Sequence, residues 1–366
     1  MAYPKVHIVI LNWNGWRDTI ECLESILRVD YPNYDIVVVD NGSDDESIER
    51  IHSWAKGDII VETSYIDRST DNKPINLVLY DRSVAENGGR FVAEKEKSFF
   101  SACERVTLIQ VGENLGFAGG SNVGIRYSLA TGSEYVWLLN NDTVVERSSL
   151  GKMVDFMGKH LDYSGITGQI RLYANRAITW NCGGKLTFYG SRKYYYANCQ
   201  VENVPQRGYR KVSFITGCAV MFRTSLFKKA GLLSEQFFFG EEDFEFSQRL
   251  RRKGYKLACL YDAIIYHKVG KSINSAACGE MLGKVYIYYL NRFIDMRNYW
   301  PTIIWEIWRF FYLVYIVVLL KLKHKISWRN FWLLSKALLK NSSGLEAVSR
   351  ATFEHALKSK FKKDMK

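Results

Sequence analysis

Short apolar runs alternate with segments of helical periodicity along the first part of the chain. The run at 6–11 ends in the turn sequence at 12–15, and residues 18–27 follow with apolar side chains at helical spacing. A second apolar run at 36–39 is followed by a helical segment at 47–54. Strands that alternate with helices are typical of a parallel sheet with crossover helices. The pattern therefore predicts an α/β fold.

The same alternation resumes after residue 105. It predicts a strand at 106–111, a glycine-rich loop at 114–121, a helix at 122–130 and a strand at 135–139. Because consecutive strands of such a sheet usually lie next to or near one another, these elements are expected to extend the sheet begun by the first two strands.

Residues 55–105 interrupt this order with a polar, mixed pattern. Their β-branched residues favour short strands at 59–61 and 75–80, but no helical or alternating period connects them. The stretch is therefore interpreted as an insertion or an elaborated loop within a first domain that spans residues 1–275.

The last part of the chain differs in charge as well as in pattern. Residues 290–366 carry 15 Lys and Arg against 5 Asp and Glu, a net charge of +10, whereas the whole chain carries +12. The chain is therefore a nearly neutral body followed by a basic, aromatic-rich helical region, residues 276–366. Such asymmetry favours an anionic partner for the basic region, either lipid headgroups or a nucleic acid.

The basic region contains an apolar and aromatic segment at 303–320. Glu306 and Arg309 interrupt it, and the uninterrupted part, 310–320, is shorter than the roughly 20 residues that span a membrane. We therefore expect a helix that lies at the membrane surface, with Trp and Tyr as anchors and Lys and Arg at the headgroups. A membrane span and an ordinary pair of core helices are the alternatives.

Composition narrows the class of protein and its compartment. Hydrophobic residues make up 47% of the chain, enough for a large core, which excludes a disordered protein. The seven cysteines are scattered without a Cys-x-x-Cys pair, which indicates neither a zinc site nor a disulfide framework. We therefore expect a reducing compartment, and the apolar run at 6–11 is too short for the core of a signal peptide.

Polar side chains follow three of the predicted strands. Asn12 and Asn14 follow the first, Asp40 follows the second, and the run 140–142 follows the strand at 135–139. In a parallel α/β sheet, ligands bind beyond the carboxyl ends of the strands, where a carboxylate can contact ribose hydroxyls or a divalent cation. Asp-Asn-Gly-Ser also forms a turn, so one such strand end is weak evidence, but three indicate a ligand site.

Two further segments are candidates for the same site. The glycine-rich loop at 114–122 opens a helix, where backbone N–H groups can approach an anion, but it matches neither a Rossmann nor a P-loop motif. His267 follows an apolar stretch, and a lone histidine is either a structural residue or a neutral metal ligand.

The segment 237–246 crowds four acids among phenylalanines, in the order Phe-Phe-Phe-Gly-Glu-Glu-Asp-Phe-Glu-Phe. Carboxylates repel one another and lose hydration beside apolar rings, so we expect raised pKa values among them. Asp243 is the candidate general base, since a carboxylate that stays ionised near neutral pH can accept a proton from a hydroxyl group. The alternative is a solvated acidic helix start, which the helix dipole also favours.

Seven motifs, in this order along the chain, resemble those of family 2 glycosyltransferases, especially the rhamnosyltransferase-like branch. They are Val-Ile-Leu-Asn-Trp-Asn-Gly (9–15), Val-Val-Val-Asp-Asn-Gly-Ser-Asp-Asp (37–45), Asn-Leu-Gly-Phe-Ala-Gly-Gly-Ser-Asn (114–122), Leu-Leu-Asn-Asn-Asp-Thr (138–143), Gly-Cys-Ala-Val-Met-Phe-Arg (217–223), Glu-Glu-Asp-Phe-Glu (241–245) and Tyr-His-Lys-Val-Gly-Lys-Ser (266–272). Each motif is weak alone, but the ordered set is specific, and it covers residues 5–275 with 55–105 poorly matched.

The resemblance implies a GT-A fold, a Rossmann-like α/β domain with a mostly parallel sheet that binds a nucleotide-diphosphate sugar. Asp40 matches the acid that contacts the base or ribose. The other residues that the family motifs place at the donor are Asn12, Asn14, Gly119, Gly120, Asn122 and Asn140. Of these, Asn12 and Asn14 would line the nucleotide pocket, and the two glycines with Asn122 would belong to a loop at the nucleotide-sugar site.

The resemblance also implies a metal site and a reaction. Asp142 matches the last acid of the family's Asp-x-Asp motif, and His267 matches a position that completes metal binding in some relatives. Asn140 replaces the first acid, and its carbonyl can bind a cation but brings no charge, which weakens the site for Mg²⁺ or Mn²⁺. Asp243 would deprotonate an acceptor hydroxyl for direct, inverting displacement at the anomeric carbon.

The implied partners are a nucleotide-diphosphate sugar, a cell-surface or lipid-linked glycan acceptor, and a membrane surface. We expect a cytoplasmic enzyme of polysaccharide synthesis, peripheral on the inner face of the cell membrane, with rhamnose as the sugar typical of the branch. Nucleic acid is not expected, because the basic region is rich in Trp and accompanies a long apolar run.

Two other functions are weighed against transfer. A sugar nucleotidyltransferase is disfavoured, because residues 11–18 hold Arg17 and a single glycine instead of a basic glycine-rich loop. The second hypothesis is a membrane-docked protein that binds a nucleotide or glycan without turnover, and release of a nucleoside diphosphate would distinguish the enzyme from it.

Overall fold

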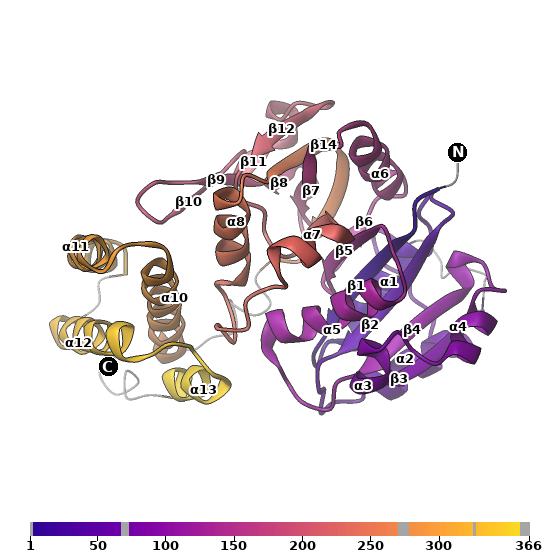
Figure 1. The fold of residues 1–366 in the computed structure, drawn as a ribbon, viewed down its shortest axis with the longest axis horizontal. Coiled ribbons are helices and arrows are strands. Elements are labelled where there is room, and N and C mark those ends of the chain that lie inside the picture. The colour runs from indigo at the N-terminus through magenta and orange to yellow at the C-terminus, as the bar shows by residue number, and fades with distance from the viewer. Residues whose placement is uncertain (1–2, 67–72, 270–277, 325–326, 359–366) are drawn as a thin grey trace.

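The computed structural model describes residues 3–66, 73–269, 278–324 and 327–358 (Figure 1). Its first elements alternate as the apolar pattern predicts, in the order β1 (Val6–Asn12), α1 (Trp16–Ile26), β2 (Tyr34–Asp40) and α2 (Ser47–Lys56). The two strands are parallel, and Asn12 pairs with Asp40 at their carboxyl ends. Both strands therefore deliver polar side chains to the same edge of the sheet.

A large mixed sheet forms the centre of the first 270 residues. Its parallel part has the order β3-β4-β2-β1-β5, which adds β3 (Asn76–Asp81), β4 (Arg105–Gln110) and β5 (Tyr135–Asn140). Antiparallel pairing beyond β5 continues the sheet through β13 (Ala219–Arg223), β7 (Tyr163–Leu172), β8 (Ile178–Asn181) and β11 (Cys199–Gln200).

The long strand β14 (Lys256–His267) completes the sheet. It runs parallel to β7 and antiparallel to β6 (Thr143–Val145) and β12 (Tyr209–Val212). Because β6 follows β5 directly, its pairing with β14 brings the carboxyl end of β14 next to the carboxyl end of β5. A separate hairpin is formed by β9 (Gly184–Leu186) and β10 (Arg192–Tyr194).

Helices cover both faces of this sheet, since its central strands are apolar on both sides. Ile8 and Ile10 of β1 pack in one core with α1, α2 and α6 (Ser149–Lys159), whereas Val9 packs in the opposite core. The opposite core includes α5 (Gly116–Ala130), α7 (Thr224–Ala230) and α8 (Glu242–Arg252). The result is the expected α/β architecture with helices on each side of the sheet (Figure 1).

Of the described residues in 55–105, those of β3 join this sheet, and the interpretation of the stretch as an insertion or an elaborated loop stays a prediction. β3 is the edge strand beside β4, and it is followed by α3 (Arg82–Glu86), α4 (Phe91–Lys97) and a 3-10 turn (Ala102–Glu104). The strand expected at 75–80 is present, but residues 59–61 form no strand. Most residues of this edge strand are only partly covered.

The predicted glycine-rich loop at 114–121 is also wrong, because helix α5 begins inside it, at Gly116. A Cβ atom on Gly120 would lie 2.5 Å from Cδ1 of Leu11 in β1. The absence of side chains therefore lets the helix approach the sheet closely, and this packing outweighs the low helix propensity of glycine.

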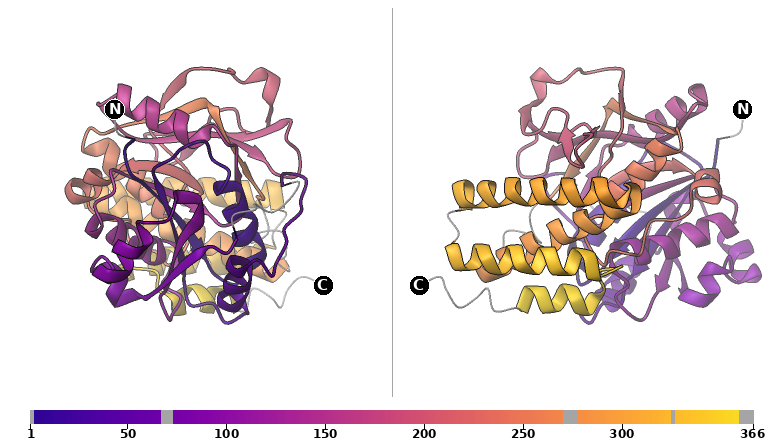
Figure 2. Two further views of the ribbon diagram at one scale, coloured as in Figure 1. Left: turned by 90° about the vertical axis from the view of Figure 1, so that its right-hand side faces the viewer. Right: turned by 60° about the vertical axis from the view of Figure 1, so that its left-hand side comes forward.

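The described part of the basic region forms four helices, which stack beside the body near α8 (Figures 1 and 2). They are α10 (Cys278–Tyr299), α11 (Thr302–His324), α12 (Trp328–Gly344) and α13 (Arg350–Lys358). Leu290, Ile316 and Leu338 are buried in a common core that also includes Phe237, from the segment in front of α8. The helices thus pack on one another and on the body. The domain boundary expected at 275–276 lies outside the described residues.

Helix α11 passes through Glu306 and Arg309 without a break. The two side chains form an ion pair, and Arg309 also donates to the carbonyl oxygen of Leu339 and the hydroxyl of Ser343 in α12. In the described ranges, Thr302–Lys321 is the one helix long and apolar enough to span a membrane, and 24% of it is buried. The choice between a surface helix, a span and a core helix therefore stays a prediction.

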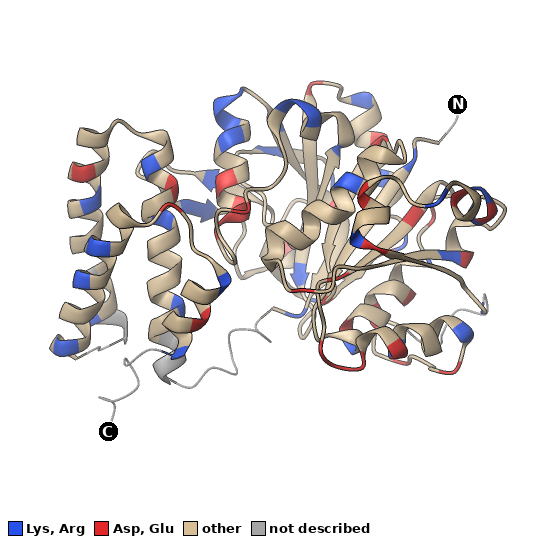
Figure 3. Cartoon of the chain, turned by 60° about the horizontal axis from the view of Figure 1, so that its bottom comes forward, with Lys and Arg blue, Asp and Glu red and all other residues tan. Residues whose placement is uncertain are grey.

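The outer face of α11 and α12 is apolar. Its large exposed side chains include Ile303, Ile307, Phe310, Phe311, Trp328 and Trp332. Figure 3 shows Lys and Arg distributed along these helices, with few acidic residues among them. The expected combination of exposed aromatic, aliphatic and basic side chains is thus present on these two helices.

Candidate active site

Asp40 and Asn12 are hydrogen-bonded neighbours at the ends of β2 and β1. Nδ2 of Asn12 donates to Oδ1 of Asp40 at 2.8 Å, and the hydroxyl of Ser43 donates to the same oxygen at 2.5 Å. Thr19 donates to Oδ1 of Asn12 at 2.7 Å, so both ends of the Asn12 amide are engaged. Asn12 is fully buried, and the prediction that it lines the nucleotide pocket is wrong. It orients the Asp40 carboxylate instead.

Asn14 lies outside the sheet and holds the loop that follows β2. Its backbone adopts a left-handed conformation (φ 50°), and its side chain is exposed. Nδ2 donates to Asp44 at 2.5 Å, and Oδ1 accepts from the backbone N–H of Asp44 at 2.9 Å. The loops after β1 and β2 are therefore joined at the rim of the site.

The three predicted donor-loop residues, Gly119, Gly120 and Asn122, are buried inside helix α5. Nδ2 of Asn122 donates to the carbonyl oxygen of Leu233 at 2.9 Å, and Oδ1 accepts from its backbone N–H at 3.0 Å. The predicted loop is thus a helix, in which the glycines provide close packing and Asn122 ties α5 to the chain beyond α7. A place of these residues at the donor stays a prediction.

The first turn of α5 does approach the acidic segment, through Gly116. Its φ is +76°, and an added Cβ atom would lie 2.2 Å from the carbonyl oxygen of Phe238. Asn41, which follows Asp40, donates to the carbonyl oxygen of Gly116 at 3.1 Å and accepts from the backbone N–H of Leu115 at 3.1 Å. The loop after β2, the start of α5 and the acidic segment therefore meet at one place.

Asp142 and His267 lie together at the ends of β5 and β14. Nε2 of His267 is 3.1 Å from Oδ1 of Asp142, and the backbone N–H of Lys268 donates to the carbonyl oxygen of Asp142 at 3.0 Å. Burial opposes the ionisation of Asp142, but the hydrogen bond and charge of His267 outweigh it and hold the pKa of the carboxyl below its usual value.

The donors around Asp142 fit a divalent cation. Oδ1 of Asn140 is buried without a hydrogen-bond partner among the described residues, and so is Nδ1 of His267. An amide oxygen, a carboxylate and an imidazole are ligand types that Mn²⁺ accepts, and Mg²⁺ takes the oxygens. The described residues contain no cluster of three or more His, Cys, Asp or Glu, so diphosphate oxygens and water would have to complete the coordination.

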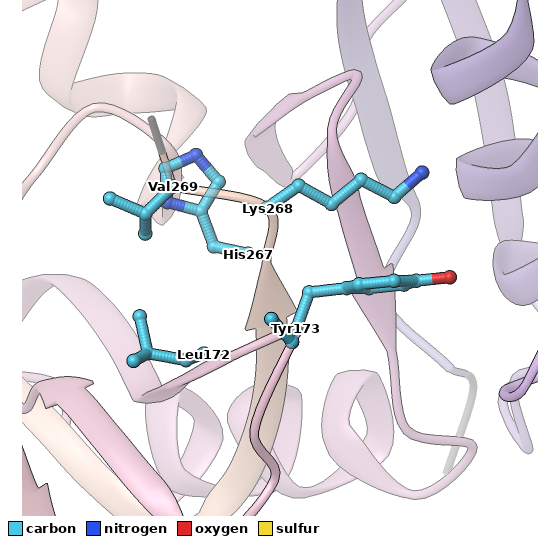
Figure 4. A pocket seen from close by; sticks show the side chains of 6 residues that line it. Leu172, Tyr173, His267, Lys268 and Val269 are labelled. Carbon is cyan, nitrogen blue, oxygen red and sulfur yellow. The ribbon is translucent and has the colours of Figure 1, made fainter. Parts of the chain in front are cut away.

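A shallow cavity of about 380 Å³ lies beside His267 (Figure 4). Its lining comes from the ends of β7 and β14, namely Leu172, Tyr173, Ala174, His267, Lys268 and Val269. Lys268 is ion-paired with Asp18 at 2.6 Å and also with Glu21, while the hydroxyl of Tyr173 donates to Glu21 at 2.7 Å. The imidazole therefore borders an open space next to the Asp142 carboxylate.

Asp243 belongs to the first turn of α8, where its neighbours come from the segment before β13. A Cβ atom on Gly217 would lie 3.8 Å from Cβ of Asp243, and the carbonyl oxygen of Cys218 accepts from the backbone N–H of Asn140 at 2.8 Å. Burial raises the pKa of the Cys218 thiol to about 12, and the charges of Asp142 and Asp243 both add to this rise. Gly217 and Cys218 thus adjoin both Asp243 and the strand end that precedes Asp142, and both carboxylates act on the Cys218 thiol.

Arg192, in β10, is a site residue that the sequence analysis missed. Its Nη1 lies 3.5 Å from Oδ1 of Asp243, and its guanidinium lies 5.1 Å from the centroid of the Phe214 ring. Aromatic contacts connect this corner to the metal-binding candidates in the order Phe214, Tyr194, Trp180 and His267, with ring centroids 5.6, 6.3 and 4.9 Å apart. These contacts connect the corner that holds Asp243 and Arg192 with the corner that holds Asp142 and His267.

The predicted rise in carboxylate pKa values is found at Glu241 and Glu242. Burial raises the pKa of Glu242 to about 7, and the charge of Asp243 adds to the shift. Burial also raises the pKa of Glu241, although Arg292 opposes the change. Asp243 itself has a side chain that is 19% exposed, so of these three acids it is the one open to a substrate.

Two family models match the chain. The model described as "Glycosyltransferase like family 2" matches residues 86–286, more than half of the chain, and the model "Glycosyl transferase family 2" matches residues 7–70. Together they include both ends of the site, from Asp40 to His267.

Two curated proteins are similar over about half of the chain. The dTDP-rhamnosyl transferase RfbF of Shigella flexneri is 24% identical over 189 residues, which cover 48% of this chain and 56% of that protein. The low-salt glycan biosynthesis hexosyltransferase Agl10 of Haloferax volcanii is 28% identical over 196 residues, which cover 53% of this chain and 61% of that protein. The chain thus spans little more than half the length of these relatives.

Two solved structures share the fold. GalNAc-T7, crystallised with UDP, GalNAc and Mn²⁺, is 13% identical with a TM-score of 0.54, over 98% of this chain and 56% of that one. The mannosyltransferase PcManGT of Pyrobaculum calidifontis, in complex with GDP-Man and Mn²⁺, is 14% identical with a TM-score of 0.51, over 100% of this chain and 89% of that one.

Proposed function

Because this chain belongs to the family 2 glycosyltransferases, we propose that it moves a sugar from a nucleotide-diphosphate donor to a hydroxyl group of a glycan or lipid-linked acceptor, with inversion at the anomeric carbon. The fold is the GT-A fold, which similar structures of glycosyltransferases share. The observation that carries the proposal is that Gly217 and Cys218 adjoin both candidate carboxylates: an added Cβ atom on Gly217 would lie 3.8 Å from Cβ of Asp243, and the carbonyl oxygen of Cys218 accepts from the backbone N–H of Asn140, two residues before Asp142.

The reaction uses the two carboxylates for different tasks. Asp243 accepts the proton of the acceptor hydroxyl as its oxygen attacks the anomeric carbon. A new C–O bond forms, the bond between the anomeric carbon and the diphosphate oxygen breaks, and the nucleoside diphosphate leaves. Since the two substrates have to be held together in line, their positioning between α8 and the ends of β1, β2 and β5 supplies much of the acceleration.

The donor diphosphate belongs at the Asp142 end. Asp142 and His267 would hold Mg²⁺ or Mn²⁺ with the carbonyl oxygen of Asn140, and the cation would neutralise charge that develops on the leaving diphosphate. Mn²⁺ in the crystal structures of GalNAc-T7 and PcManGT supports this assignment. Asp40, held by Asn12 and Ser43, is the candidate for the ribose or base.

The identity of the donor sugar is drawn from the relatives. RfbF is named as a dTDP-rhamnosyl transferase, and Agl10 as a hexosyltransferase of glycan biosynthesis. We propose dTDP-rhamnose as the first donor to test, and a cell-surface glycan under synthesis as the acceptor.

Membrane docking through α11 and α12 is part of the proposal. Phe311 is 66% exposed and Trp332 is 69% exposed on the outer face. Large exposed apolar side chains that gather in this way are uncommon on the surface of a soluble protein. Lys336 and Lys340 lie one and two turns beyond Trp332 on the same side of α12 and are exposed. Apolar side chains flanked by cations suit an anionic leaflet, so we propose a peripheral enzyme on the cytoplasmic face of the membrane.

A screen of sugar nucleotides tests this function. The full chain is incubated with Mn²⁺ or Mg²⁺ and a panel that includes dTDP-rhamnose, UDP-sugars and GDP-mannose, and release of the nucleoside diphosphate is measured. Release from one donor, stimulated by a lipid-linked or glycan acceptor, is the expected result. Tight binding of a donor without any release would instead favour the binding protein without turnover.

A further inference from the structure

Helix α10 of the basic region contacts the acidic segment through a fully buried ion pair. Arg292 and Glu241 are both 0% exposed, and Nη2 of Arg292 lies 3.3 Å from Oε2 of Glu241, while its Nε donates to Oε1. The guanidinium also stacks on Phe244, 3.5 Å from the ring centroid. Glu241 precedes the proposed base by two residues, and Phe244 follows it directly. Arg292 thus contacts the chain on both sides of Asp243, at Glu241 and at Phe244.

The same arginine also holds the hairpin that carries Arg192. Nη1 of Arg292 donates to the carbonyl oxygen of Gly190 at 2.5 Å, two residues before Arg192. Arg192 in turn faces Asp243 at 3.5 Å. Arg292 therefore ties together the two segments whose side chains meet at the base.

Other contacts of α10 fix the acidic segment in the same position. Nδ2 of Asn291 donates to the carbonyl oxygen of Phe239 at 2.9 Å, and the hydroxyl of Tyr299 donates to Oε1 of Glu245 at 2.7 Å. Met296 packs in a buried cluster with Phe244. Three residues of α10 besides Arg292 thus contact the acidic segment.

We propose that Arg292 is a positioning residue of the active site, which sets the place of Asp243 by binding Glu241 and Gly190 at once. This inference rests on the proposed function, in which Asp243 is the base. A buried ion pair loses much of its hydration, so its net stabilisation is small and its value lies in fixing one geometry. A displacement of about 1 Å at a reacting group can cost about 100-fold in rate, and the helices of the basic region are therefore part of the catalytic unit.

The test compares two arginines of the same helix in the full chain. Arg292→Met removes the ion pair with Glu241 and the hydrogen bond to Gly190. Arg292→Lys keeps the positive charge but cannot donate to both partners with the planar geometry of a guanidinium. Arg297→Met is the matched control, because Arg297 donates to the carbonyl oxygens of Ser342, Ser343 and Leu345 at the end of α12 and lies 6.0 Å from the centroid of the Trp305 ring in α11. These contacts tie α10 to other helices of the basic region. Turnover is measured with the donor that the screen identifies, and backbone amide exchange is measured for residues 237–245.

Arg292→Met is expected to lower kcat by about 100-fold while the KM for the donor changes less than about threefold, since the donor contacts lie at the ends of β1, β2 and β5. Arg292→Lys is expected to recover part of the loss. Arg297→Met should keep kcat within about threefold of the wild-type value even if its melting temperature falls. Amides 237–245 should exchange faster in Arg292→Met than in Arg297→Met.

Three results would overturn the inference. They are an unchanged kcat in a folded Arg292→Met variant, an equal loss in the Arg297 control, or unaltered exchange at 237–245. If Arg292→Met does not fold, the double variant Glu241→Gln/Arg292→Met removes both charges, and wild-type turnover in that variant would likewise refute the positioning role. Amide exchange judges the role of Arg292 even if no sugar nucleotide is turned over, so failure of the proposed function is seen separately.

Discussion

Arg192 and Asp243 face each other across the candidate active site, with Nη1 of the arginine 3.5 Å from Oδ1 of the aspartate. Burial opposes the charge of the guanidinium, but the carboxylate of Asp243 outweighs it and holds the pKa of Arg192 above its usual value. The arginine therefore stays cationic, and an acceptor hydroxyl has to reach Asp243 beside a fixed positive charge.

Replacing Asp243 by Asn should lower kcat by about 100-fold or more, because the amide cannot accept the proton of the acceptor. Donor affinity, measured by calorimetry with the nucleoside diphosphate and Mn²⁺, should change little. Asp155→Asn makes the same substitution at an exposed residue of α6 and should leave kcat unchanged. Near-normal turnover of the Asp243 variant would remove this residue from the mechanism.

Removal of divalent cations with a chelator should suppress turnover, and addition of Mn²⁺ should restore it. Asp142→Asn and His267→Ala should each weaken the Mn²⁺ dependence by at least about tenfold, because each removes a candidate ligand. The measurement is a titration of activity against Mn²⁺ concentration. Turnover that is insensitive to the chelator would show that the site works without a metal, which the neutral Asn140 in place of an acid would then explain.

The stability of the protein should depend on pH through Glu242. Its pKa is raised from 4.5 to about 7 in the folded state by burial first and by Asp243 second. The folded state therefore binds more protons than the unfolded state between these values, and the free energy of unfolding falls as the pH rises from 4.5 through about 7. Glu242→Gln should remove this dependence and raise the free energy of unfolding at pH 8 by about 1–3 kcal/mol.

Denaturant unfolding at pH 5 and pH 8 measures this effect. Oε2 of Glu242 accepts from the backbone N–H groups of Gly240 and Glu241, at 2.7 and 3.0 Å, and the carbonyl oxygen of a glutamine can keep one of these bonds. Equal stabilities of the wild-type protein and the variant at both pH values would contradict the prediction.

Binding to vesicles that contain anionic lipid should depend on the outer face of α12. Lys336→Gln and Lys340→Gln each remove about 1 kcal/mol of attraction to an anionic leaflet, so the double variant should bind about 30-fold more weakly. Lys56→Gln/Lys95→Gln removes the same charge from the exposed surface of α2 and α4 and should bind as the wild-type protein does. Similar losses in both double variants would indicate a general charge effect instead of docking by α12.

The strands of the parallel core could be predicted from sequence because each is a short apolar run that ends in a polar turn. The pairing of Asn12 with Asp40 at neighbouring strand ends follows from this pattern. The pattern failed at 59–61, which form no strand, and where packing overrides local propensity, as at Gly120 in α5. The local sequence pattern predicts which residues are buried and where turns lie, but it does not predict how closely a helix packs against a strand.

The candidate site was foreseen in its acids and in His267, but not in its arginines. Asp142, His267 and Asp243 stood out as strand-end or clustered residues or through the family motifs. Arg192 and Arg292 did not, since their partners Asp243 and Glu241 lie 51 residues away in the chain in each case. Local periodicity cannot predict these arginines, because they meet the acids only in the folded chain. Four crowded acids do imply that some cation lies close to them.

The hydrogen bonds from Asn12 to Asp40 and from Thr19 to Asn12 continue to Asn141, whose Nδ2 donates to the Thr19 hydroxyl at 3.1 Å. Thr19 of α1 therefore connects the nucleoside end of the proposed donor pocket to its diphosphate end through hydrogen bonds, without contacting a ligand itself. If Thr19→Val lowers the affinity for the donor, the cause would be the lost alignment of the two ends of the pocket, and not a folding defect far from the site.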